Sequence, residues 1–248
     1  MNIAHLWDKV LNFEYDEKKL TAGLDDFLRQ HKDEKILDCA AGTGFAVLNL
    51  EKQGYDITYS DGSENMIKEF RKKRDVMGLK GIRPHRVLWS ELGKRFPRKF
   101  DVVICRGSSL IYASGWDRPY QHNEGIIHDA LRNFSEALKP GGMLYIDTTS
   151  EDSLYGKHVV STTYFPKRIQ GQKTKLHEVL YTNRSKKIRT WKPVLRFDHQ
   201  KYALTRYSAY LPHEDLTDIL KSADFRTIRR RAITGEHYAV FTAYKNHR

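Results

Sequence analysis

Residues 36–44, with the sequence ILDCAAGTG, form an apolar run that ends in small residues and two glycines. The run predicts a short buried strand, because apolar stretches of this length are typical of strands covered on both faces. Gly42 and Gly44 allow a sharp turn and a close approach of a ligand to the backbone. Asp61 follows the next strand-like run, residues 55–60. The order of elements is a strand, a glycine loop, a helix, a second strand and an acidic residue. This order predicts a cofactor site at the carboxyl ends of parallel strands.

Strand-like and helix-like segments alternate through the first 150 residues, which predicts a parallel sheet with helices on both faces. The expected strands are residues 35–40, 55–60, 82–88, 100–105 and 143–147. The expected helices are residues 21–31, 44–53, 63–77 and 121–138. Later segments are predicted as an antiparallel hairpin (178–182 with 187–191), a helix (214–223) and two final strands (225–231 and 237–245).

These elements predict one domain over residues 1–248, of the α/β class. It is a doubly wound, seven-stranded, mostly parallel sheet with an antiparallel β insertion after the fifth strand, at about residues 155–210. We expect the insertion to cover the acceptor pocket. Residues 1–31 are expected to form an N-terminal lid helix, with Trp7 and Phe13 on it.

The composition excludes several classes of protein. The 248 residues carry a net charge of +12, and 12% of them are aromatic, whereas disordered chains combine high charge with few aromatics. No apolar run approaches the ~20 residues that cross a bilayer, and the N-terminus has no apolar secretory segment. Two cysteines exclude a disulfide framework and a cysteine zinc site. No H-x-x-H pattern occurs, so no metal site is expected. We therefore expect a soluble, cytoplasmic protein.

Three motifs together resemble the class I S-adenosylmethionine-dependent methyltransferases. Residues 36–44 are similar to the first motif of that class, and residues 61–66, DGSENM, resemble the second, D-x-S-x-x-M. Residues 138–144, LKPGGML, resemble the segment that enters the fifth strand. The three motifs cover about residues 20–150. The resemblance implies a Rossmann-like fold and S-adenosylmethionine as cofactor.

Within the class, the chain is most similar to the glycine and glycine/sarcosine N-methyltransferases. Three stretches carry this likeness: FDVVICRGSS at 100–109, YID at 145–147 and YLPH at 210–213. The likeness implies transfer of a methyl group to a small molecule, with an amine nitrogen as the acceptor atom.

The resemblance also implies which residues bind the cofactor. Ala40 and Gly42 would lie against its methionine part, and Asp61 would hold the ribose hydroxyls. Asp38 would orient the loop or accept from the cofactor amine. The full set of expected cofactor-binding residues is Asp38, Ala40, Gly42, Gly44, Asp61, Gly62, Met66, Leu88, Trp89, Arg106 and Ser109. Plain core packing is an equal alternative for Met66 and Leu88.

The acceptor site is expected at the ends of the fourth and fifth strands, under the insertion. The candidate catalytic residues are Ser108, Tyr112, Asp147 and Tyr210. Candidates for the pocket wall are Tyr164, Tyr181, Tyr207 and Tyr210, and His213 is either a pocket residue or part of a helix start. In the glycine N-methyltransferases an arginine after the fifth strand holds the substrate carboxylate, and Thr149 occupies that position here. Candidates to replace it are Arg106, Arg168 and Arg206.

Two other functions are consistent with parts of the sequence. Basic residues cluster at 68–74 and 226–231, as in proteins that bind nucleic acid, which favours an RNA methyltransferase acting on a cap or a tRNA base. Against it, the fourth strand ends in RGSS and not in the [DNS]-P-P-[YF] motif of amino-methylating nucleic-acid enzymes. The second alternative hypothesis is that the protein is a non-catalytic binding module with a methyltransferase-like fold. The expected partner is a small-molecule acceptor, with nucleic acid less favoured, no membrane, and a homo-oligomer left open.

Overall fold

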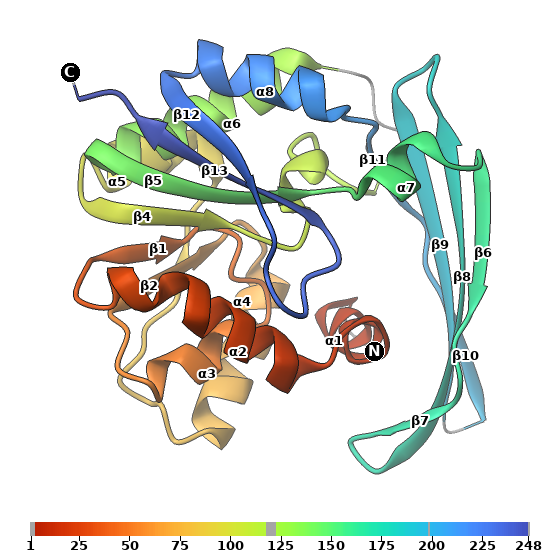
Figure 1. The fold of residues 1–248 in the computed structure, drawn as a ribbon. Coiled ribbons are helices and arrows are strands. Elements are labelled where there is room, and N and C mark those ends of the chain that lie inside the picture. The colour runs from red at the N-terminus through yellow and green to blue at the C-terminus, as the bar shows by residue number, and fades with distance from the viewer. Residues whose placement is uncertain (1–2, 118–122, 198, 248) are drawn as a thin grey trace.

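The computed structural model describes residues 3–117, 123–197 and 199–247, which form two β-sheets with helices around the larger one (Figure 1). The larger sheet has seven strands in the order β12-β13-β5-β4-β1-β2-β3. Its strands are β1 (Ile36–Asp38), β2 (Ile57–Asp61), β3 (His85–Arg86), β4 (Phe100–Cys105), β5 (Leu138–Thr148), β12 (Phe225–Arg231) and β13 (Ala239–Lys245). Neighbours from β3 to β5 are parallel, whereas β13 runs antiparallel to both β5 and β12. The predicted seven-stranded, doubly wound sheet is confirmed.

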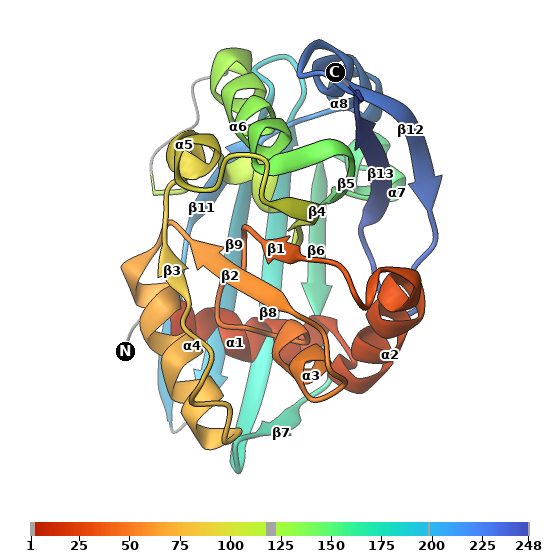
Figure 2. The ribbon, with the colours of Figure 1, turned by 90° about the vertical axis from the view of Figure 1, so that its left-hand side faces the viewer.

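Helices cover both faces of this sheet, as the alternating pattern predicted (Figure 2). One face carries α2 (Glu17–Leu28), α3 (Val47–Glu51) and α4 (Glu64–Val76). The other carries α5 (Leu92–Arg95), α6 (Glu124–Ala137) and α8 (His213–Ser222). Short 3₁₀ turns are η1 (Arg29–His31), η2 (Trp89–Glu91) and η3 (Ser109–Tyr112). The expected start of α6 at Gln121 lies outside the described residues.

Several boundaries differ from the prediction for local reasons. The helix expected over 44–53 shortens to α3, and Ala46, directly before it, has a φ of 65° that no helix accommodates. The strand expected over 82–88 shortens to two residues that directly follow Pro84, which has no N–H for a ladder. β5 begins at Leu138 and includes the KPGG segment that was expected as a helix stop.

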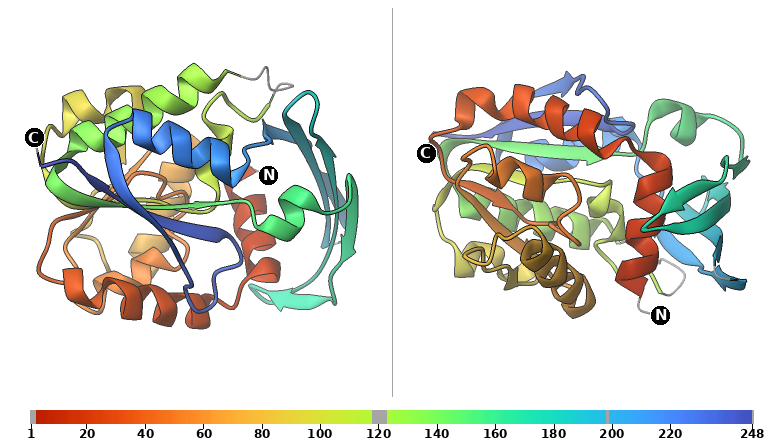
Figure 3. Two further views of the ribbon diagram at one scale, coloured as in Figure 1. Left: turned by 45° about the horizontal axis from the view of Figure 1, so that its top comes forward. Right: turned by 90° about the horizontal axis from the view of Figure 1, so that it is seen from below.

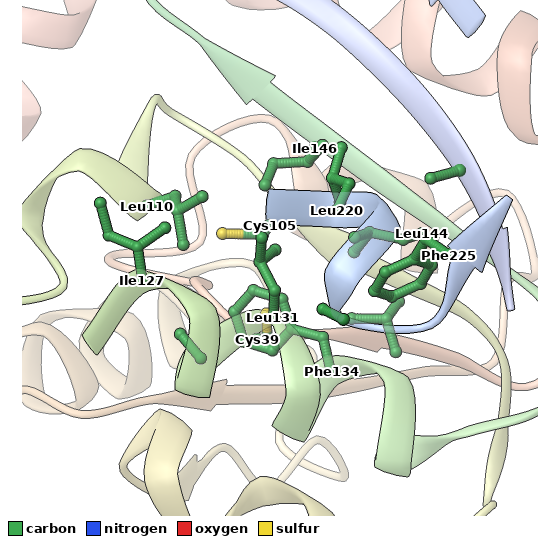
Figure 4. Close-up of a cluster of buried hydrophobic side chains, with 14 of the residues drawn as sticks. Cys39, Cys105, Leu110, Ile127, Leu131, Phe134, Leu144, Ile146, Leu220 and Phe225 are labelled. Carbon is green, nitrogen blue, oxygen red and sulfur yellow. The ribbon is translucent and has the colours of Figure 1, made fainter. Parts of the chain in front are cut away.

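Two apolar layers hold the helices on the sheet. Between the sheet and α6 and α8, buried side chains such as Leu131, Phe134 and Leu220 pack on β4 and β5 (Figure 4). Cys39 and Cys105 belong to this layer and form no disulfide. On the opposite face, α2 contributes Leu20, Leu24 and Leu28 to a second layer. The core therefore fixes β1, β4 and β5, whose carboxyl ends carry the site described below.

The second sheet is the predicted insertion. It contains β6 (Val159–Thr163), β7 (Lys167–Ile169), β8 (Gln172–Asn183), β9 (Ile188–Phe197), β10 (Gln200–Ala203) and β11 (Arg206–Ala209). A short helix, α7 (Glu151–Tyr155), leads into it from β5. The predicted hairpin is confirmed, because β8 and β9 pair antiparallel with Leu180 opposite Trp191. Figure 1 shows this sheet standing at one end of the larger one.

The segment expected as one lid helix forms two helices, α1 (Ile3–Glu14) and α2. The chain breaks at Asp16, whose extended backbone and side chain cap α2 by accepting from the Lys19 N–H. α1 lies between the two sheets (Figure 3). It packs Leu6, Val10 and Phe13 with Leu176 and Leu195 of the insertion. None of the described helices has both the length and the apolar character needed to cross a bilayer.

Candidate active site

A cavity of about 240 Å³ lies where β1, β2 and β4 end, at the point predicted for the cofactor. Most of the residues expected to bind cofactor line it, contributed by the ends of β1 to β4 and by the segments that follow them. These are Asp38, Ala40, Gly42, Asp61, Gly62, Met66, Trp89, Arg106 and Ser109. Because they come from sequence positions that are far apart, the sheet topology, and not local sequence, brings them together.

Two carboxylates shape the backbone of this cavity. Asp61 accepts from the Gly42 N–H (2.9 Å) and from the Ser63 N–H (2.7 Å). Asp38 accepts from the Ala40 N–H at 3.1 Å. Burial raises the pKa of Asp38 to about 7 and also raises the pKa of Asp61. An ionised carboxylate has about four lone-pair positions, so Asp61 retains capacity for two hydroxyls of a sugar.

The glycine loop turns where left-handed backbone is required. Gly42 has a φ of 53° and Gly44 a φ of 79°. Gly44 is not among the lining residues, and a Cβ on it would stand 2.5 Å from Leu48 Cδ1. Its contribution is therefore the turn itself and the close packing of α3, not a ligand contact.

Leu88 does not line the cavity, in contrast to the expectation for it. Its side chain is 52% exposed, and its Cδ2 lies 3.2 Å from where a Cβ on Gly62 would stand. It thus covers Gly62 from outside. Trp89 does face the cavity, because its Nε1–H donates to the Cys39 carbonyl (2.7 Å) and its ring packs edge-to-face on Phe134. Trp89 and the buried Met66 provide an apolar surface that fits an adenine ring.

Arg106 is held by internal partners. Its guanidinium contacts Glu236 at 3.3 Å and donates to the Phe45 carbonyl at 3.1 Å. The Ser109 hydroxyl donates to the Arg106 carbonyl, and Tyr15 donates to Glu236 at 2.7 Å. The charge of Arg106 is therefore already neutralised, and the residue connects the end of β4 with the loop before β13.

α1 closes the cavity through contacts that sequence reasoning did not identify. The Asp8 carboxylate accepts from the Thr43 hydroxyl in the glycine loop and pairs with Lys73 of α4 at 2.8 Å. The preceding residue, Trp7, packs edge-to-face on Tyr112 and Trp191, with ring centroids 6.3 and 5.4 Å away. Trp7 therefore touches both the larger sheet's loops and the insertion.

A second cavity, of about 250 Å³, adjoins the first. Four residues line both cavities: Trp7, Leu11, Tyr112 and Tyr238. The inner face of the insertion provides much of the remaining wall, including Val160, Thr162, Glu178, Leu180, Arg189 and Trp191. These residues share one face because neighbours across antiparallel strands point to the same side, as with Leu180 and Trp191. The insertion thus forms one wall of the second cavity.

The four candidate catalytic residues divide into two pairs. Ser108 and Tyr112 line the second cavity, and the buried Ser108 hydroxyl has no hydrogen-bond partner among the described residues. Asp147 and Tyr210 line neither cavity. Both oxygens of Asp147 accept backbone N–H groups, from Gly107 (3.0 Å) and Ser108 (2.5 Å). Asp147 thus holds the turn in which Ser108 adopts a φ of 51°.

The tyrosines expected as pocket wall do not line the second cavity. Tyr181 faces outward and is 41% exposed, because it alternates with the inward Leu180 along β8. The Tyr164 hydroxyl donates to the Glu178 carboxylate at 2.8 Å but does not itself line the cavity. Tyr207 packs against the hydrophobic core. Aromatic rings of Trp7, Trp191 and Tyr238 form the wall instead, and no motif marked them.

None of the three arginines considered as replacements at Thr149 reaches the second cavity. Arg106 lines the first one, Arg168 donates to the Gly171 carbonyl, and Arg206 pairs with Asp117 at 3.2 Å. Arg189 of β9 lies there instead and donates to the Thr149 hydroxyl. The alternation of β9 is the signal that would have found it, because Arg189 and Trp191 occupy the same face. His213 binds the Thr149 carbonyl (2.8 Å) and lines neither cavity.

The basic run at 68–74 is partly neutralised within the protein. Lys73 pairs with Asp8, Lys72 with Glu69, and Arg74 with Asp75. In the part of the chain that the structure describes, no group of three His, Cys, Asp or Glu side chains could hold a metal ion. The cavities are therefore the strongest candidates for a functional site.

Comparison with known proteins gives a matching family and several similar sequences. A family described as a methyltransferase domain matches residues 30–200 of the chain. Glycine/sarcosine N-methyltransferase of Parasynechococcus marenigrum (strain WH8102) is 29% identical over 149 residues, which make up 60% of this chain and 49% of that protein. Glycine N-methyltransferase of Rattus norvegicus is 33% identical over 137 residues, or 53% of this chain and 45% of that protein. The chain spans about half the length of the curated relatives it matches. The predicted resemblance to this group is confirmed.

A solved structure shows the same fold over nearly the whole chain. The S-adenosylmethionine-dependent methyltransferase from Clostridium acetobutylicum ATCC 824 superimposes with a TM-score of 0.74, covering 98% of both chains at 19% identity. At that identity the match supports the arrangement of strands and helices, and it leaves the acceptor to be argued from this chain's own residues.

Proposed function

The chain belongs to the methyltransferase-domain family, and on that premise we propose that it transfers a methyl group to a nitrogen atom of a small-molecule amine. Its cofactor is S-adenosylmethionine. The observation that carries the proposal is the second cavity, which adjoins the first and is lined from the larger sheet, α1 and the insertion. Because α1 and the insertion wall this cavity on two sides, an acceptor of small size is favoured over a polymer.

The first cavity fits the cofactor. The Asp61 carboxylate would hold the two ribose hydroxyls, while Met66 and Trp89 would contact the adenine. Left-handed backbone at Gly42 lets the loop approach the methionine part without a side chain in between. When bound, S-adenosylmethionine would supply an electrophilic methyl carbon on a positively charged sulfur. The amine nitrogen would bond to that carbon as the carbon–sulfur bond breaks with its electron pair left on sulfur, and the nitrogen would release a proton to solvent.

This chain's own residues position the acceptor and exclude water. Tyr112 and Tyr238 line both cavities, so they border the path between the two ligands. The unpartnered Ser108 hydroxyl would bind the acceptor close to the reacting nitrogen. A peptide α-amine titrates near pH ~8 and an alkylamine such as that of lysine near ~10.4, so the acceptor must lose a proton before its nitrogen can attack. Catalysis then rests mainly on holding the two reactants in line.

Turnover on small amines tests the proposal. The purified chain is incubated with S-adenosylmethionine and a panel of primary and secondary amines, and products are detected by a mass gain of one methyl group. We expect methylated amine together with demethylated cofactor. Cofactor consumption with RNA fragments, and none with any amine, would favour the RNA methyltransferase. Binding of cofactor without transfer to either class would favour a binding module. A reducing compartment is also proposed, since Cys39 and Cys105 are buried and unbridged.

A further inference from the structure

Arg189 is a buried arginine with spare donors at the wall of the second cavity. Its exposed fraction is 6%, and it lines the cavity from the inner face of β9. Its Nη1 donates to the Thr149 hydroxyl and its Nη2 to the Ser153 hydroxyl, while Nε has no partner among the residues that the structure describes. A guanidinium has five N–H donors, so three remain after these two bonds.

No carboxylate neutralises this charge within the described residues. Arg189 makes no ion pair there, and the groups that favour its charged form are the phenols of Tyr112, Tyr210 and Tyr238. Burial consequently lowers the pKa of Arg189. By contrast, the other arginine at the site, Arg106, has the Glu236 carboxylate at 3.3 Å. A buried cation without a counter-ion destabilises the folded state, because it loses its hydration without a compensating charge. The protein retains it at a cavity wall, where a bound anion can offset that cost.

The size and the walls of the cavity constrain the rest of the ligand. Its volume is about 250 Å³, many times the space that a single water needs. Trp7, Leu180 and Trp191 provide apolar wall beside Arg189. A ligand with only a carboxylate and an amine would leave this apolar wall uncovered. Glu14 also lines the cavity, and burial raises the pKa of its carboxyl to about 8, which leaves this group to face the amine end of a ligand.

Resting on the proposed function, we infer that the acceptor is an amino carboxylate larger than glycine, whose carboxylate binds Arg189 and whose side chain packs on Trp7 and Trp191. The guanidinium fork matches the two oxygens of a carboxylate, which an ammonium group in the same place would not. Arg189 is thus a specificity residue contributed by the insertion. Its hydrogen-bond partners are Thr149, directly after β5, and Ser153 of α7. These two hydroxyls orient the guanidinium group.

The experiment compares amino acids with their decarboxylated amines. The pairs are glycine with methylamine, leucine with 3-methylbutylamine, and phenylalanine with 2-phenylethylamine. The wild type is expected to have at least about tenfold higher kcat/KM for leucine or phenylalanine than for the matching amine, and than for glycine. Arg189→Met keeps a buried apolar side chain of similar length and should remove the carboxylate preference. Arg189→Lys should restore part of it.

Arg196→Met is the matched control, because Arg196 lies on the same strand with its side chain exposed. It should keep the wild-type preference, and unchanged cofactor affinity verifies that each variant is folded. A carboxylate preference equally large in Arg189→Met, or absent from the wild type, would overturn the inference, as would glycine as the best acceptor of the panel.

Failure of the proposed function gives a different result. Binding of leucine and phenylalanine is also measured by the fluorescence of the tryptophans that line the cavity, with cofactor present. If the wild type methylates none of the amines yet binds these two amino acids, and Arg189→Met does not, the methyl-transfer proposal fails while the carboxylate site stands. If amines and amino acids react equally well, the carboxylate site fails while the methyl-transfer proposal stands. If there is neither turnover nor Arg189-dependent binding, both fail.

Discussion

The two cavities of this protein are built in opposite ways. The first is built around the turns that follow neighbouring strands of the larger sheet, with Asp61 accepting from the N–H groups of Gly42 and Ser63. The second is made of side chains that project from the inner face of the insertion, such as Arg189 and Trp191. A site made of turns tolerates few changes, whereas a site on alternating strand positions can change its chemistry one side chain at a time. This contrast suggests that cofactor binding is fixed by the fold and acceptor choice by the insertion.

The largest effect that tests this contrast is expected at Asp61. In Asp61→Ala the sugar hydroxyls and two loop N–H groups lose a buried charged acceptor. We expect this loss to weaken the free energy of cofactor binding by about 2 kcal/mol, which is about a 30-fold loss of affinity. Titration calorimetry with S-adenosylmethionine measures the change. Asp56→Ala removes an exposed carboxylate just before β2 and serves as control. An unaltered dissociation constant for Asp61→Ala would remove the ribose assignment.

The same contrast explains what the sequence could predict. The strand order, the glycine loop and Asp61 followed from residues that are close together in sequence and whose backbone conformations are restricted. The insertion's hairpin also followed, because β-branched and aromatic residues bracket a turn at residues 183–185. The wall of the second cavity did not follow. Its residues depend on which strand face turns inward, and a one-residue difference moves Tyr181 outward and Leu180 inward.

Buried polar groups were the hardest to assign from sequence. Asp147 stands at a strand end, as a catalytic acid would, yet its two oxygens are occupied by the backbone of Gly107 and Ser108. Arg189 stands in a strand that resembles many amphipathic strands, yet it is buried without a carboxylate. Only the contacts in the folded structure distinguish a carboxylate that shapes a turn from a cation that is available to a ligand.

The residue that connects the two cavities is Trp7, and its substitution should weaken ligand binding in both. Trp7 lines both cavities and packs on Tyr112, Trp116 and Trp191. Aromatic pairs contribute about 0.5–1.5 kcal/mol each, so Trp7→Ala should weaken cofactor and acceptor binding by about tenfold each. Equilibrium dialysis with cofactor and steady-state kinetics with the best amine measure the two effects. Phe165→Ala, which truncates an aromatic side chain that is 90% exposed, should change neither. An effect on one ligand alone would show that α1 belongs to a single cavity.

The smallest effect is expected at Leu88, where the sequence and the structure disagree about the cofactor. The sequence resemblance places Leu88 against the adenine, whereas its side chain is 52% exposed and packs outside Gly62. Exposed substitutions usually change free energies by less than about 0.5 kcal/mol, so Leu88→Ala should change cofactor affinity by no more than about twofold to threefold. Trp89→Ala provides the contrast, because Trp89 lines the cavity and is fixed by the Cys39 carbonyl. Calorimetry measures the cofactor affinity of both variants. A loss of affinity for Leu88→Ala as large as that for Trp89→Ala would mean that Leu88 moves onto the adenine when cofactor binds. The cavity's outer wall would then be completed by the ligand, and the clean division between a preformed cofactor site and a variable acceptor site would no longer hold.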